Sequence, residues 1–180
     1  MSFGSRIGRY RDDTPPPEEA LMSSDGFTIC LWFDGRAEEA ATHYVSIFKN
    51  SRLGRVTHYG EGAFQPAGTV LTVDFEANGQ RFVALNGGPQ FTFTEAVSFQ
   101  ILCADQDEID YYWNSLTEGG EPGPCGWLKD RFGVSWQVVP TALIEMINDS
   151  DAQKAARATA AMMSMGKLDL AALEKAYAGE

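Results

Sequence analysis

The chain has 180 residues, of which 44% are hydrophobic and 12% aromatic, so it can bury the core of one domain or of two small packed modules. Its formal net charge of −11, with no run of basic residues, argues against nucleic acid as a partner. No apolar stretch approaches the roughly 20 residues that cross a bilayer, and the N-terminus lacks the apolar segment of a secretory signal. We therefore expect a cytoplasmic protein without a membrane partner.

Residues 1–26 read as a flexible tail. They contain scattered arginines, an acidic pair and three consecutive prolines at 15–17, and they show no apolar periodicity. Proline joins neither a helix interior nor a strand ladder, so this segment is expected to be extended.

The first structured half is predicted to span residues 27–89. Its elements are a β-branched and aromatic strand, an amphipathic helix and three further strands, the last two joined by the Asn78-Gly79 hairpin turn. In chain order the predicted ranges are 27–33, 37–48, 51–59, 69–75 and 80–85.

The same order of elements returns over residues 95–140. A strand at 97–103 precedes a helix that Asp105 is suited to cap, and short strands are predicted near 127–128 and over 134–139. The sequence thus indicates an α+β protein made of two consecutive βαβββ halves.

Residues 141–180 form a helical C-terminal extension in this prediction. Asp151 and Asp169 are each placed to cap a helix. Helices this short are marginal alone, so they must pack either on the main body or on a partner subunit.

The three cysteines form neither a paired metal motif nor a disulfide framework. Cys30 and Cys103 lie in apolar strands, where we expect buried thiols, and Cys125 lies in a Gly-Pro-Cys-Gly loop, where we expect the most exposed one.

Several segments together resemble the PhnB-like family of the vicinal oxygen chelate superfamily, which also contains glyoxalases and bleomycin-resistance proteins. The most specific segment is residues 126–137, with the sequence GWLKDRFGVSWQ. The others are residues 31–35, residues 37–40 with Tyr44, and residues 82–88, 112–113, 119–120 and 165–169. The resemblance implies paired βαβββ modules that form an open eight-stranded cup, usually completed in a homodimer. Many members carry the label 3-demethylubiquinone-9 3-methyltransferase.

The resemblance also implies where a metal would be held. Superfamily members typically bind a divalent cation with His, Glu or Gln from four strands, and the matching places here lie near Ile29, at 84–86, at Ser98 and at Gln137. Only Gln137 matches a family ligand, and one neutral amide does not hold a cation. No cofactor is therefore expected, although a divalent metal remains an alternative.

A small-molecule ligand is the expected partner of the cup. Asn86, Ser98 and Gln137 are the candidate ligand-orienting residues, and Trp32 is the candidate aromatic wall. Strand alternation predicts that Trp136 packs outside the cup if Gln137 faces it. His58, at the end of a strand, is the candidate general base, because imidazole exchanges protons near neutral pH.

Three functions remain open from the sequence. The first is a small-molecule-binding protein with a degenerate metal site. The second is a metal-dependent lyase or dioxygenase-type enzyme of the same superfamily, whose metal would be completed by substrate, water or the second subunit. The third is a methyltransferase, as the family label states, although the glycine-rich segments at 86–89 and 119–123 read as turns and helix ends.

Overall fold

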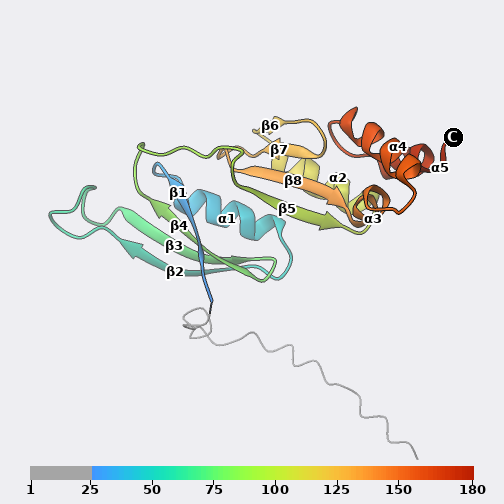
Figure 1. The fold of residues 1–180 in the computed structure, drawn as a ribbon. Coiled ribbons are helices and arrows are strands. Elements are labelled where there is room, and N and C mark those ends of the chain that lie inside the picture. Colours follow the sequence, from blue (N-terminus) through green and yellow to red (C-terminus); the bar gives the residue numbers. More distant parts are fainter. Residues whose placement is uncertain (1–25) are drawn as a thin grey trace, which may run out of the picture.

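The computed structural model describes residues 26–180, so the predicted tail lies outside the described residues apart from Gly26. The described residues form eight strands and five helices (Figure 1). The first half contains β1 (Ile29–Phe33), α1 (Ala37–Ile47), β2 (Arg52–His58), β3 (Val70–Ala77) and β4 (Gln80–Asn86). The second half contains β5 (Ser98–Cys103), α2 (Gln106–Thr117), β6 (Glu121–Pro122), β7 (Trp127–Lys129) and β8 (Ser135–Pro140). The chain closes with α3 (Thr141–Ile147), α4 (Ala152–Met163) and α5 (Leu170–Ala178).

The two halves share one topology. The strand order is β1-β4-β3-β2 in the first sheet and β5-β8-β7-β6 in the second. In each sheet the first and last strands of the half pair in parallel, and the remaining pairs are antiparallel. The predicted α+β class with two consecutive βαβββ units is confirmed, and both sheets are open. The two-residue strand β6 was not predicted, because Glu121-Pro122 has no strand-like pattern.

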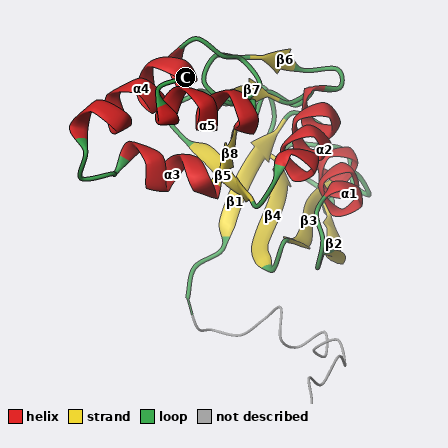
Figure 2. Cartoon of the chain, turned by 90° about the vertical axis from the view of Figure 1, so that its right-hand side faces the viewer, coloured by secondary structure: helices red, strands yellow, loops and turns green. Residues whose placement is uncertain are grey.

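Each sheet is covered on one face by the helix of its own half. Helix α1 packs its alanines and Tyr44 on β3 and β4, where the small side chains allow a close approach. Helix α2 packs Ile109, Trp113 and Leu116 against the second sheet. The two helices lie side by side (Figure 2), and the ring of Phe48, just after α1, stacks on Tyr112 of α2 with centroids 5.5 Å apart. One continuous apolar core therefore runs beneath both sheets.

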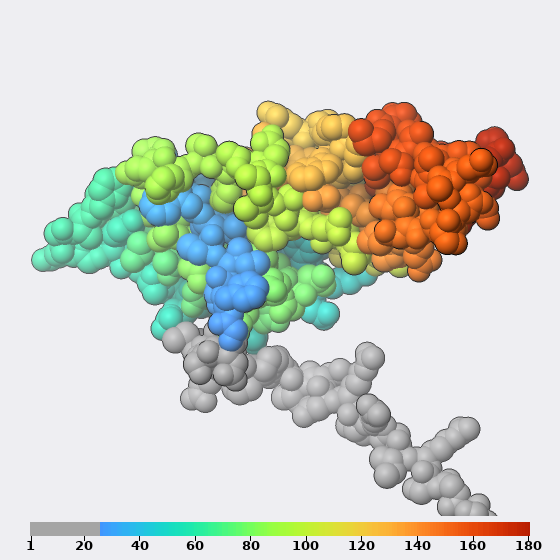
Figure 3. Space-filling view, viewed as in Figure 1, coloured from blue at the N-terminus to red at the C-terminus, as the bar shows by residue number. Residues whose placement is uncertain are grey.

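The C-terminal helices pack on the second half of their own chain. Gln106 of α2 donates to the carbonyl of Leu168 at 3.3 Å and accepts from the amide of Leu170 at 2.8 Å. Lys167 forms an ion pair of 2.6 Å with Asp110. The helices thus form one end of the molecule (Figure 3), with a small core of their own that includes Leu143, Met146, Ala158, Leu168 and Leu173.

The predicted helix caps are present. The carboxylate of Asp105 accepts from the amide of Glu108, that of Asp151 accepts from the amides of Gln153 and Lys154, and that of Asp169 accepts from the amide of Ala172.

The thiols are distributed differently from the prediction. Cys103 is buried as expected, and burial raises its pKa to about 12. Cys30, however, is exposed, and Cys125 is only half-buried, so the most exposed thiol is Cys30. The reason is the direction of side chains along β1: Leu31 and Phe33 face the core under α1, which leaves Cys30 and Trp32 on the face of the first sheet that α1 does not cover.

Candidate functional site

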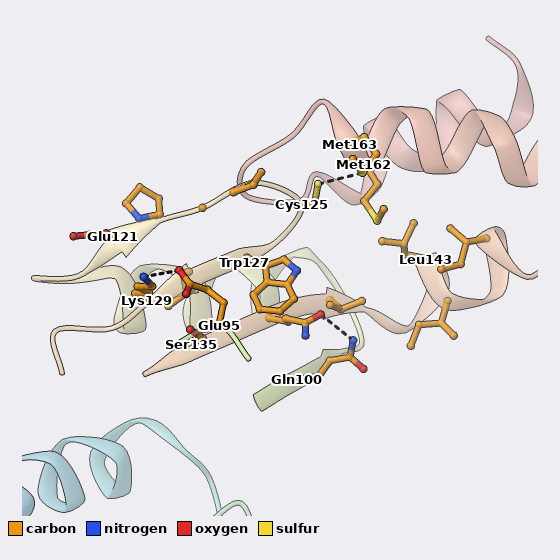
Figure 4. A pocket seen from close by; sticks show the side chains of 18 residues that line it. Glu95, Gln100, Glu121, Cys125, Trp127, Lys129, Ser135, Leu143, Met162 and Met163 are labelled. Atoms are coloured by element: carbon orange, nitrogen blue, oxygen red, sulfur yellow. Dashed lines mark hydrogen bonds and ion pairs between the residues drawn. The ribbon is translucent and has the colours of Figure 1, made fainter. Parts of the chain in front are cut away.

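A cavity of about 690 Å³ lies between the face of the second sheet that α2 leaves free and the C-terminal helices (Figure 4). Side-chain alternation along β8 directs Ser135, Gln137 and Val139 to this face, while Trp136 and Val138 face the core. The predicted relation between Gln137 and Trp136 is therefore observed. The cavity is lined by Glu95, Gln100, Glu121, Pro122, Gly123, Pro124, Cys125, Trp127, Leu128, Lys129, Ser135, Gln137, Val139, Leu143, Ile144, Ile147, Met162 and Met163.

The floor of the cavity carries uncharged polar side chains. In the parallel pairing of β5 with β8, Ser98 is opposite Ser135 and Gln100 is opposite Gln137. The amide nitrogen of Gln137 donates to the hydroxyl of Ser98 at 2.8 Å, and that of Gln100 lies 3.5 Å from the amide oxygen of Gln137. These groups offer hydrogen bonds to a ligand without adding charge.

Ser135 has a hydroxyl that lacks a partner. The residue is only 1% exposed, and its Oγ makes no hydrogen bond with any described residue. Leaving a buried hydroxyl unpaired costs about 1–3 kcal/mol. Because the oxygen itself is almost fully covered, a molecule bound in the cavity pairs with it only after a small rotation of the serine side chain.

One end of the cavity carries two carboxylates and one ammonium group. Lys129 of β7 forms an ion pair of 2.5 Å with Glu95, and Glu121 lies at the same end (Figure 4). The ammonium group of Lys129 lowers the pKa of Glu95 through a hydrogen bond. Since these two charges compensate each other, this end does not present a free cation to an anionic ligand.

The opposite end is apolar. Trp127 stands above the floor, and Leu143 lies at the far end of the cavity with the other side chains of α3 (Figure 4). Met162 and Met163 close the side that faces the loop before β7, where the thiol of Cys125 lies 3.6 Å from the thioether sulfur of Met163. The cavity therefore changes from polar to apolar along its length.

Of the four predicted ligand-binding residues, only Gln137 lines the cavity; Ser98 does not line it but accepts a hydrogen bond from the amide of Gln137. Asn86 and Trp32 lie in the first half and do not line the cavity. The side chain of Asn86 is buried, accepts from the amide of Ala37 at 2.9 Å and donates to the carbonyl of Val70 at 3.0 Å, so it holds the start of α1. The indole of Trp32 donates to the carbonyl of Gly88 at 2.8 Å.

The candidate general base is also remote from the cavity. His58 is the last residue of β2, the strand at the edge of the first sheet, and its side chain is exposed. It is not among the lining residues.

The side chains present do not fit a divalent cation. Within residues 26–180, no three His, Cys, Asp or Glu side chains come together. At the places that the resemblance indicates, Ser98 and Gln137 supply only neutral oxygen donors, and the amide of Asn86 is already engaged. A divalent cation held by this set would lack a compensating negative charge.

The sequence interpretation missed part of the site. Ser135 and Val139 could have been found, because they lie two residues to either side of Gln137 on a strand and must share its face. The contribution of Met162 and Met163 depends on how α4 folds back over the sheet, and no local pattern reports that.

The chain is similar to one known protein family and to several solved structures. The family described as 3-demethylubiquinone-9 3-methyltransferase matches residues 25–139. Among solved structures, a PhnB protein from Bacillus cereus, named as a 3-demethylubiquinone-9 3-methyltransferase, is 34% identical with a TM-score of 0.57; the match covers 64% of this chain and 98% of that one. A protein from Pseudomonas aeruginosa is similar in fold, at 21% identity and a TM-score of 0.52 over 64% of this chain and 98% of that one. No curated protein matches.

Proposed function

We propose that this protein binds an uncharged small molecule in the cavity over the second sheet. The chain belongs to the PhnB-like family, which is described as 3-demethylubiquinone-9 3-methyltransferase. The observation that carries this proposal is the unpartnered hydroxyl of Ser135, buried at the wall of a 690 Å³ cavity beside the hydrogen-bonded pair Ser98 and Gln137. Cavities of this size, mostly apolar with a few converging polar groups, are typical of small-molecule sites.

The chemistry of the floor indicates a neutral ligand. Gln100, Ser135 and Gln137 can donate and accept hydrogen bonds, but none of them carries charge. The half-buried indole of Trp127 offers an apolar surface next to them, on which a planar group can stack. An uncharged hydroxyl, carbonyl or amide attached to a flat ring would satisfy both surfaces.

The two turns that lead from a strand into a helix favour a binding protein over a methyltransferase. A conventional methyl donor binds where a parallel strand leads into a helix, close to free amides at the helix start. Here the amide of Ala37 is taken by Asn86 at the start of α1, and the amide of Glu108 is taken by Asp105 at the start of α2. Side chains thus occupy both positions.

We further infer a homodimer. On the first sheet, Cys30 is paired with Val83 and Trp32 with Leu85, and these four side chains share the face opposite α1. The ring of Phe91 lies edge-on against Trp32 at 5.0 Å, but no described helix packs on that face. An apolar sheet face of this kind is stabilised by a second copy of the chain.

The cytoplasmic location also belongs to this proposal. All three thiols of the chain are free, as is usual in a reducing compartment. None of the helices within residues 26–180 has both the length and the apolar character required to cross a bilayer.

The proposal is tested with 1-naphthol, a neutral ring with one hydroxyl, titrated calorimetrically into the full-length protein. We expect saturable binding that weakens at least tenfold in Trp127→Ala and is unchanged in Phe64→Ala, an exposed aromatic residue outside the cavity. Equal affinity in Trp127→Ala and the wild type would contradict the proposal. Stoichiometric metal in the purified protein would favour the metal-dependent enzyme, and calorimetric binding of a methyl donor would favour the methyltransferase.

A further inference from the structure

The C-terminal helices supply a wall of the cavity that lies beyond the family match. That match ends at residue 139, and α3 begins at Thr141. Leu143, Ile144 and Ile147 from α3 and Met162 and Met163 from α4 nevertheless line the cavity. We infer that this wall gives the protein its ligand class: a neutral amphiphile whose polar head lies on the floor and whose aliphatic chain lies against α3 and α4. The inference rests on the proposed function.

The wall is fixed to the second half by backbone contacts. The amide of Cys125 donates to the carbonyl of Met165 at 2.7 Å, and the amide of Gly126 donates to that of Gly166 at 2.8 Å. These bonds tie the turn after α4 to the loop that leads into β7. The end of α4, with Met162 and Met163, is therefore held beside Cys125 over the cavity (Figure 4).

The side chains of the wall select for hydrocarbon. Leu143, Ile144 and Ile147 have no hydrogen-bonding group, so a polar or charged ligand group placed there would lose its hydration without compensation. The two methionines are flexible and polarisable, and such side chains adapt to chains of different shape.

The cavity-facing side chains of β8 change from polar to apolar along the strand. Gln137 and Val139 are consecutive side chains on the cavity face and lie about 7 Å apart along the strand, and Leu143 comes one helical turn later. A head group bonded at Ser135 and Gln137 thus directs any attached chain over Val139 and towards α3. The charged end at Glu95 and Lys129 lies in the other direction.

The test is a calorimetric titration of the full-length protein with 4-methylphenol, 4-butylphenol and 4-hexylphenol. If the chain is buried against the wall, the affinity should rise by up to about fourfold per added methylene. In Ile147→Ser and in Met163→Ser the rise per methylene should shrink relative to the wild type and to a control variant away from the cavity. Both residues are partly exposed, at 38% and 64%, so these variants retain the fold. Val56→Ser is the matched control, because Val56 is 37% exposed and lies on β2 away from the cavity.

Failure of this inference can be told apart from failure of the proposed function. If 4-methylphenol binds but longer chains add no affinity, the inference is wrong and the proposed function stands. If the rise persists undiminished in both wall variants, the chain lies elsewhere, and the inference is again wrong. If no member of the series binds, both are contradicted.

Discussion

The phenol of Tyr44 on α1 donates a hydrogen bond of 2.7 Å to the carboxylate of Asp130, which directly follows β7 in the other half of the chain. The same carboxylate accepts from the indole of Trp136 at 2.8 Å and from the amides of Phe132 and Val134. Asp130 is only 3% exposed, so its charge is held by these four donors. The cavity strand β8 is thus positioned by a side chain of the first half.

Asp130→Asn should destabilise the protein strongly. An amide in place of the carboxylate can still accept from Phe132 and Val134 through its oxygen. Its nitrogen cannot accept, so the indole of Trp136 loses its partner and the hydroxyl of Tyr44 must turn from donor to acceptor. We expect the free energy of unfolding to fall by roughly 3 kcal/mol or more, measured by urea denaturation. Tyr44→Phe removes only one donor and should cost less. A loss below about 0.5 kcal/mol in Asp130→Asn would show that the carboxylate does not hold the two halves.

The same contact predicts a loss of stability at alkaline pH. Burial, and then the charge of Asp130, raise the pKa of Tyr44 well above its ordinary value of 10.0. Because the pKa of Tyr44 is higher in the folded than in the unfolded protein, the protonated phenol contributes fully to the free energy of unfolding below pH 10. This contribution is lost as the pH rises above 10, by about 1.4 kcal/mol per pH unit. Urea denaturation between pH 8 and 11.5 should show the wild type losing its advantage over Tyr44→Phe above pH 10. The thiol of Cys103, whose pKa is also raised, is present in both proteins, so its effect on stability cancels in the difference between them. A constant difference across this range would contradict the prediction.

Ser135→Ala should separate binding from stability. Because the hydroxyl of Ser135 has no partner among the described residues, its removal should leave the free energy of unfolding unchanged or raise it by about 1 kcal/mol. The affinity for 1-naphthol should nevertheless fall roughly three- to tenfold, the value of one neutral hydrogen bond. Ser98→Ala is the contrasting variant, since it removes the acceptor of the Gln137 amide and should lower stability. A less stable Ser135→Ala with normal binding would assign the hydroxyl a structural role.

Chelation is expected to leave the protein unchanged. The polar side chains of the cavity floor, Gln100, Ser135 and Gln137, are neutral, and so is Ser98, which is hydrogen-bonded to Gln137. Dialysis against EDTA should therefore change neither the melting temperature nor the affinity for 1-naphthol by more than measurement error. Loss of either, with recovery on adding Mn²⁺ or Zn²⁺, would overturn this expectation.

Much of the fold could be predicted because its signals are local. The hairpin turn at Asn78-Gly79, the cap at Asp105 and the helical spacing of 37–48 each depend on a few neighbouring residues. The exposure of Cys30 could not be predicted, because an apolar strand reads the same whether one or both of its faces are covered.

The candidate site was less predictable because it depends on which elements meet. Asn86 has the right chemistry for a ligand contact, but the start of α1 takes both ends of its amide. The apolar wall comes from α3 and α4, whose own sequence indicates only that they are helical and that Asp151 caps α4. Their place over the cavity is set by tertiary contacts with residues 125–126 and 106–110.

Gly126→Ala should loosen the C-terminal wall. Gly126 has a φ of +81°, and a Cβ there would lie 2.7 Å from the carbonyl oxygen of Val138 and 3.1 Å from Leu168, the buried residue that anchors the turn before α5. The matched control is Gly133→Ala, since Gly133 has a φ of +85° and open space around it. Both variants should lose about 1–2 kcal/mol of unfolding free energy through backbone strain, and Gly126→Ala should lose more through the clash.

Binding distinguishes this loosening from a general loss of stability. If Leu168 and the end of α4 shift in Gly126→Ala, the gain in affinity from 4-methylphenol to 4-hexylphenol should fall, because the chain loses its apolar contact with Met162 and Met163. In Gly133→Ala the gain should stay at the wild-type value, since the strained turn lies at the other end of β8 and contacts neither methionine. Equal stability losses in the two variants, with an unchanged gain in both, would show that the loop at Gly126 does not hold the helices over the cavity.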